Sequence, residues 1–185
     1  MIKTMCQLTT RTLLAVLLGA GLLACSEPES EQRSLDPVVF HDTDECHVCG
    51  MVITDFPGPK GQAVDKAGVK KFCSAAEMLG WWLQPENRIG DAKLYVHDMG
   101  RSDWLKPDDS HLIDATSAFY VVGLGDSGLK GAMGAVLASF ADEQAAGKLA
   151  AIHGARVLRF EQIDQGVLQQ AAATQHVGMH GQATH

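Results

Sequence analysis

The sequence predicts an α+β domain built from two related β-β-α-β lobes. Three observations support this fold class: short apolar runs are separated by turn residues, the predicted helices begin with a capping-box spacing or with acidic residues, and the same order of elements occurs twice. This repeat places the first lobe at residues 36–105 and the second lobe at residues 106–165.

The first lobe begins with a predicted hairpin around Ala67 and Gly68. Its elements are two strands, a helix and a third strand, at residues 62–65, 69–72, 74–84 and 93–98. Ser74 lies three residues before Glu77, which is the spacing of a helix N-terminal capping box. We therefore expect the helix to begin at Ser74.

The second lobe repeats this order. Its elements are two strands, a helix and a third strand, at residues 118–124, 136–140, 142–152 and 156–160. Asp142 and Glu143 place acidic residues in the first turn of the helix, where they oppose its positive end. Gly154 follows the last helical residues and is the expected glycine just beyond the helix.

Residues 1–24 are predicted to be a signal peptide. Lys3 and Arg11 give a basic start, and residues 12–23 form an uncharged apolar or small run. That run is too short for a membrane-spanning helix, which needs about 20 apolar residues. The run ends in Leu-Leu-Ala-Cys, which resembles a bacterial lipobox and predicts acylation of Cys25. An ordinary secretory signal cut near Ala24, leaving Cys25 as a free thiol, is the alternative.

The two ends of the mature chain are predicted to lie outside the fold. Residues 25–35 are polar and acidic and form the lipidated tether, whereas residues 166–185 form a flexible tail that contains His and Met. After loss of the signal peptide the chain has 13 basic and 22 acidic residues, a net charge of −9. This charge excludes a nucleic-acid partner, because phosphate binding needs a basic surface.

The cysteines give the first indication of function. Cys6 is lost with the signal peptide and Cys25 is acylated, which leaves Cys46, Cys49 and Cys73. An odd number cannot pair completely within one chain in an oxidising compartment. At least one thiol is therefore free, bound to metal or open to intermolecular chemistry.

A Cys-x-x-Cys-Gly-Met motif concentrates soft metal ligands. It contains Cys46, His47, Cys49 and Met51, and Gly50 allows the backbone to turn so that Met51 can face the thiols. Thiolate and thioether donors favour a soft ion, and Cu(I) fits best because a thioether adds little for Zn(II). The motif therefore predicts a copper site.

Three other interpretations of this motif stay open. Cys46 and Cys49 could form a disulfide, or act as a thioredoxin-like redox pair, although the motif does not join a strand to a helix. A structural zinc site would need a second ligand pair, which Cys73 alone does not supply. Cys73 is instead expected to be a small buried residue.

Further ligands must come from elsewhere in the chain. The candidates outside the motif are Met and His residues at strand ends and in loops, namely His41, His97, Met99, His111 and Met133. Met133 is flanked by Gly131 and Gly134 in a loop that leads into the 136–140 strand of the second lobe, so we expect it to close the site from that lobe. No pattern of a hydrolytic or phosphate-binding enzyme is present, so the protein is predicted not to be an enzyme.

Several segments together resemble the NosL family of nitrous oxide reductase accessory lipoproteins. They comprise the Cys-Gly-Met motif in residues 44–53, the Gly-Pro-Lys segment in residues 57–62, and residues 95–98, 104, 114–123, 133–134 and 154–160. The resemblance extends from residue 36 to residue 163, with the lipobox in addition. Ala132 stands where many relatives have proline before the Met-Gly pair.

The resemblance implies a membrane-anchored, periplasm-facing Cu(I) chaperone for the copper centres of nitrous oxide reductase. It implies ligands at Cys49, Met51 and Met133, and a fold similar to a domain of organomercurial lyase. The implied partners are nitrous oxide reductase and its ABC-type maturation transporter. The protein is expected to be a monomer, and Ser26 after the lipidated cysteine favours the outer membrane.

Two other functions are weighed against the chaperone. A thiol-disulfide reductant would use Cys46 and Cys49, and a protein that handles mercury or another soft metal would fit the thiol content and the fold analogy. Zn(II) is a candidate for a second metal.

Overall fold

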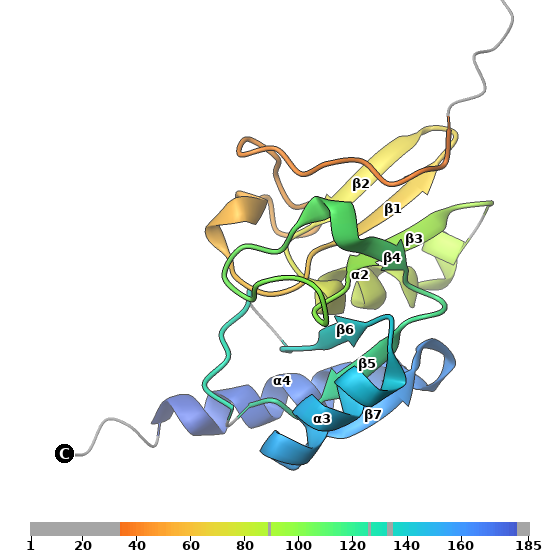
Figure 1. Cartoon of the computed structure of the whole chain (residues 1–185). Helices are drawn as coiled ribbons and strands as arrows, with labels where there is room; N and C mark the ends of the chain where they lie inside the picture. Colours follow the sequence, from red (N-terminus) through yellow and green to blue (C-terminus); the bar gives the residue numbers. More distant parts are fainter. Residues whose placement is uncertain (1–33, 89, 126, 133–134, 181–185) are drawn as a thin grey trace, which may run out of the picture. The chain divides into compact units, whose positions relative to one another are not determined.

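The computed structural model describes residues 34–88, 90–125, 127–132 and 135–180 (Figure 1). These residues form two small antiparallel sheets with helices packed against them. Within these ranges, no helix is both long enough and apolar enough to cross a membrane. The signal peptide, the lipidated Cys25 and most of the predicted tether lie outside the described residues.

The first sheet has four strands in the order β2-β1-β3-β4. The strands are β1 (Gly61–Asp65), β2 (Gly68–Phe72), β3 (Lys93–His97) and β4 (Leu112–Asp114). The β1–β2 turn is tight because one Asp65 carboxylate oxygen accepts the N–H groups of Ala67 and Gly68, at 2.8 and 2.9 Å. The predicted hairpin is thereby confirmed.

The second sheet has three strands in the order β6-β5-β7. The strands are β5 (Phe119–Val122), β6 (Ala138–Phe140) and β7 (Arg156–Arg159). β4 lies beyond residue 106, where the second lobe was predicted to begin, yet it pairs with β3 of the first sheet. One core cluster includes Phe72 of the first sheet and Tyr120 of the second. Strand pairing and the core both cross the predicted boundary at residue 106, and the division into two lobes stays a prediction.

Two helices begin within one residue of their predicted starts, and the first of them ends two residues before the predicted residue 84. In α2 (Ala75–Trp82), the Ser74 side chain accepts the Glu77 N–H at 3.1 Å. In α3 (Glu143–His153), Asp142 caps the first turn, and Gly154 ends the helix in the left-handed conformation. Short 3-10 turns complete the fold, at η1 (Ile53–Asp55), η2 (Pro85–Arg88), η3 (Asp109–His111) and η4 (Phe160–Gln162).

The predicted flexible tail is wrong for most of its length. Residues 165–180 form α4 (Gln165–His180), which begins after Asp164 accepts the Val167 N–H at 2.8 Å. Leu168 and Ala171 are buried in the main core cluster. Packing stabilises this helix, and its few, small apolar residues gave too weak a periodicity for the sequence to reveal it.

Residues 36–53, here called the leading segment, run along the first sheet before β1 (Figure 1). The Gln62 side chain holds Val38 through two hydrogen bonds, of 2.9 and 2.8 Å. Lys71 of β2 donates its ammonium to the Val39 carbonyl at 2.7 Å and pairs with Asp44. These contacts fix both the path and the register of the segment that carries the Cys-x-x-Cys-Gly-Met motif.

Candidate metal centre

The motif folds into a tight loop. The Cys46 N–H donates to the Met51 carbonyl at 2.9 Å, and the Gly50 N–H donates to the Cys46 carbonyl at 2.9 Å. Gly50 has a φ of +70°, a left-handed conformation that favours glycine. The loop is docked on β2 because the His47 N–H donates to the Lys71 carbonyl at 2.8 Å.

Three thiols and one carboxylate converge beside this loop. The ligand atoms of Cys46, Cys49, Cys73 and Glu77 all lie within 4.8 Å of one another. One Glu77 oxygen lies 2.9 Å from the Cys46 sulfur and 2.8 Å from the Cys73 sulfur. The Cys49 sulfur lies 3.7 Å from that of Cys73 and 3.8 Å from the same Glu77 oxygen. We call these four residues the thiol cluster.

Sequence reasoning missed two members of the cluster. Cys73 is buried, as expected, but its sulfur faces the motif from the junction between β2 and α2. Glu77 was assigned to a capping box, and its N–H does bond to Ser74. Its carboxylate, however, accepts hydrogen bonds from thiols. The signal that could have found both is their short separation at the start of the predicted helix, where Cys73 immediately precedes the capping residue and Glu77 lies in the first turn.

Burial makes the thiols hard to ionise without a cation. Burial, followed by the hydrogen bond to Glu77, raises the pKa of Cys73 far above its usual value. The same two causes, in the same order, raise the pKa of Cys46. A metal ion in the cluster would displace these protons and neutralise the thiolates.

Exposure differs across the cluster. Cys46 and Cys73 are 3% and 1% exposed, whereas Cys49 is half-buried. Met51 has 36% of its surface exposed at the end of the same loop. The buried pair thus forms the inner side of the thiol cluster, and Cys49 lies on its solvent side.

His47 and Met99 make contacts outside the thiol cluster. The His47 ring is exposed and packs edge-on against Phe72 and Trp81, with centroids 5.9 Å away in each case. Met99 packs against a different hydrophobic cluster from that of Cys46 and Cys73. Met133 lies outside the described residues.

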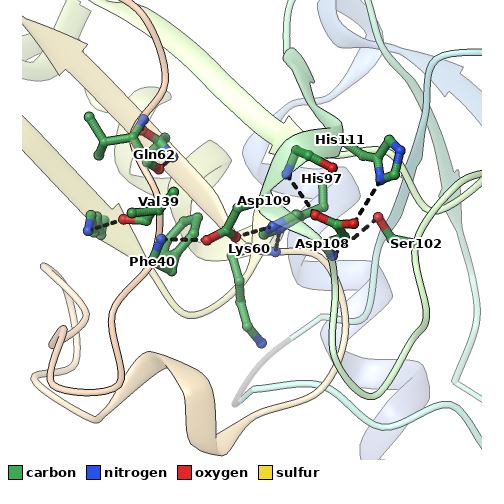
Figure 2. Close-up of polar contacts among 12 residues, drawn as sticks. Val39, Phe40, Lys60, Gln62, His97, Ser102, Asp108, Asp109 and His111 are labelled. Carbon is green, nitrogen blue, oxygen red and sulfur yellow. Dashed lines mark hydrogen bonds and ion pairs between the residues drawn. The ribbon is translucent and has the colours of Figure 1, made fainter.

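The remaining histidines also lie apart from the thiol cluster. The His111 Nδ1 is 3.6 Å from an Asp108 carboxylate oxygen (Figure 2). His97 is buried, with its Nε2 2.9 Å from Asp109. His41 is exposed, and its N–H donates to Asp44 at 2.7 Å.

The fold brings three sulfurs and one carboxylate together. A protein with this arrangement belongs to the class of small domains that can bind a soft metal ion. The sequence model of the NosL family matches residues 37–168. The chain therefore belongs to the NosL family.

Two similar proteins are also members of the NosL family. The chain is 74% identical over 172 residues to the copper-binding lipoprotein NosL of Stutzerimonas stutzeri, which covers 93% of this chain and 89% of that protein. It is 33% identical over 164 residues to the copper-binding lipoprotein NosL of Achromobacter cycloclastes, covering 85% and 84%.

A solved structure is similar as well. The crystal structure of the copper chaperone NosL from Shewanella denitrificans matches with a TM-score of 0.66 and 39% sequence identity. The match covers 72% of this chain and 99% of the crystallised chain. These relatives are named for copper binding or copper delivery and not for a reaction, in agreement with the prediction that the chain is not an enzyme.

Proposed function

We propose that this protein carries Cu(I) as cargo in the thiol cluster and delivers it for assembly of the copper centres of nitrous oxide reductase. The observation that carries the proposal is the convergence of the sulfurs of Cys46, Cys49 and Cys73. Sulfur donors select soft ions, and Cu(I) is the softest of the common biological candidates. The names of the similar proteins support copper as the metal.

The gradient of exposure suits delivery by ligand exchange. Cys46 and Cys73 would hold the ion from the protein side, and Cys49 with the Met51 thioether would hold it at the surface. A partner's ligand could then replace Cys49 or Met51 before the buried thiols release the ion. Free copper would not be formed during such a transfer.

Met133 is proposed as a further donor, and its described neighbours support this. Ala132 and Ala135 are buried in the same hydrophobic cluster as Cys46 and Cys73. The Trp104 indole donates to the Lys130 carbonyl at 2.7 Å, and the Trp104 carbonyl accepts the Gly58 N–H at 2.7 Å. These contacts hold the stem of the Met133 loop against the segment that follows the motif.

Glu77 is the one hard donor in the cluster. A carboxylate adds little to the binding of Cu(I) but suits a borderline ion. A second metal such as Zn(II) would therefore use Glu77 with one of the buried thiols.

The proposed setting is the periplasmic face of a bacterial membrane. Acylated Cys25 would anchor the chain through the tether, with the outer membrane favoured by Ser26. The proposed partners are nitrous oxide reductase and its ABC-type maturation transporter, and the protein would act as a monomer.

The alternative function as a thiol-disulfide reductant is less well supported by the geometry. Such a reductant needs an accessible thiol with a lowered pKa. Cys46 is 3% exposed, and burial raises its pKa. The environment of Cys46 suits a metal ligand better than an attacking nucleophile.

Anaerobic titration with Cu(I) against a competing chelator tests the proposal. The combined Cys49→Ser and Met51→Leu variant should lose at least about tenfold in Cu(I) affinity, or about 1.4 kcal/mol. Met99→Leu removes a thioether outside the cluster and is the matched control, with no expected change. Equal retention of Cu(I) by the wild type and the double variant would contradict the proposal.

A further inference from the structure

A cavity is lined by residues other than those of the thiol cluster. It is a cavity of about 380 Å³ between the leading segment, η1 and the residues before η3. Its apolar lining includes Phe40, Phe56 and Leu105, and its charged lining includes Lys60. None of the three described cysteines lines this cavity.

Lys60 is a buried cation without an acidic partner. It is 4% exposed, and its ammonium donates to the carbonyl of Phe56 and to that of Pro57, the latter at 3.2 Å. Over the described ranges, no carboxylate lies within ion-pair distance of this ammonium. Burial lowers the pKa of Lys60 to about 8. Carbonyl dipoles thus only partly replace the water that the charge has lost.

The nearby Asp109 is already engaged and does not neutralise Lys60. One of its oxygens lies 2.9 Å from the His97 Nε2, and the other accepts the Phe40 N–H at 2.7 Å (Figure 2). The His97 Nδ1 accepts the Lys60 main-chain N–H at 3.1 Å, so the ring proton lies on Nε2 and faces Asp109.

His97 does not add a second positive charge. Burial lowers its pKa, which keeps the imidazole neutral at neutral pH. The ammonium of Lys60 extends away from the His97–Asp109 pair (Figure 2). The other charged lining residues, Asp42 and Lys106, are exposed. Among the described residues that line the cavity, the buried charge without a counter-ion is therefore positive.

We propose that this cavity binds a small organic monocarboxylate, with its carboxylate on the Lys60 ammonium and its apolar body against Phe40, Phe56 and Leu105. Burying an unpaired charge costs several kcal/mol, and a carboxylate would offset part of that cost. A volume of about 380 Å³ lies in the range of small-molecule sites. Leu105 is 77% exposed, so a ligand would also cover an exposed apolar side chain.

The test is a titration of the isotope-labelled protein by NMR at neutral pH, with benzoate as the probe and benzamide as its neutral isostere. Benzoate should give saturable shifts at Phe40, Thr54 and Leu105 and bind at least about tenfold more tightly than benzamide. Equal binding of the two probes, or no saturable shift with benzoate, would overturn the proposal. This comparison needs no variant.

Two lysine variants test whether the Lys60 ammonium is the charge that binds benzoate. Lys60→Met, with an amide spectrum that shows the fold intact, should weaken benzoate binding at least about tenfold. Lys148→Met, an exposed lysine on α3, is the matched control and should leave binding unchanged. Cys49→Ser should also leave it unchanged, because Cys49 does not line the cavity. Full benzoate affinity in a folded Lys60→Met protein would overturn the assignment.

Discussion

The thiol cluster and the Lys60 cavity flank the same leading segment, but they bury opposite kinds of ionisable group. In the cluster, one carboxylate lies against three thiols, and these groups become anionic when their protons leave. In the cavity, an ammonium lies against main-chain carbonyls with no carboxylate paired to it. The first arrangement favours a cation and the second an anion. In both regions, burial shifts the pKa so that the neutral form of the group is favoured. A ligand of opposite charge would favour the charged form, so the direction of the shift indicates the charge of the ligand.

The largest expected difference between the two regions is a strong rise of Cu(I) affinity with pH at the thiol cluster. Burial and Glu77 raise the pKa of both Cys46 and Cys73, so these thiols are protonated at neutral pH in the metal-free protein. Each proton that copper displaces should strengthen apparent Cu(I) binding about tenfold per pH unit. Chelator competition at several pH values around neutrality measures this slope. A flat profile would show that neither buried thiol binds the ion.

The Lys60 cavity should make protein stability depend on pH. Burial lowers the pKa of Lys60 from 10.5 to about 8, so the unfolded chain binds more protons between these values. The free energy of unfolding of the wild type should therefore rise with pH across that window, relative to Lys60→Met. The expected change in the difference is on the order of 2 kcal/mol. Urea unfolding of both proteins across the window measures it.

Taking the difference between the two proteins removes a competing effect. The raised pKa values of Cys46 and Cys73 stabilise the fold only below the usual thiol pKa of 9.0, and this stabilisation is lost as pH rises further. Both proteins share that loss. If the wild type and Lys60→Met keep a constant difference across the window, the lysine is not held in a costly charged state.

Glu77→Gln should lower the pKa of the buried thiols in the cluster. It keeps a hydrogen-bond acceptor but removes the negative charge that helps to raise the pKa of Cys73. The midpoint of thiolate formation, followed by ultraviolet absorbance, should fall. Glu86→Gln on η2 is the matched control, because its side chain is exposed and far from the cluster in sequence. Identical midpoints in all three proteins would assign the shift to burial alone.

The smallest effect is expected outside both regions. Deleting residues 178–185 removes two histidines and one methionine but none of the four cluster residues. Cu(I) affinity should change by less than tenfold, or about 1.4 kcal/mol. A larger loss in the same competition assay would add the end of the chain to the metal site.

The parts of this account that the sequence predicted are the locally encoded ones. The β1–β2 turn, the Ser74 cap and the Gly154 helix end depend on residues close together in the chain, and the structure confirms each of them. Asp142, predicted as an acidic residue of the first helical turn, is the capping residue just before it. The Cys46 and Cys49 pair was found for the same reason. Two bonding groups separated by two residues can reach one ion without information about the fold.

The missed features depend on distant packing. Cys73 follows β2 directly and precedes α2. It meets the motif because the leading segment is hydrogen-bonded to β2 at Lys71. β4 joins the first sheet through pairing with β3, and α4 is ordered by the burial of Leu168. None of these contacts leaves a periodic or spaced pattern strong enough to predict from one sequence.

The central claim is that Cys73 completes the metal centre with the Cys-x-x-Cys-Gly-Met motif, and Cu(I) titration of Cys73→Ser tests it most directly. The variant changes one buried sulfur to oxygen and leaves the motif intact. We predict that a folded Cys73→Ser protein binds Cu(I) at least about a hundredfold more weakly than the wild type, and with a shallower pH slope. Wild-type affinity in a folded Cys73→Ser protein would contradict the account and restrict the site to the motif loop.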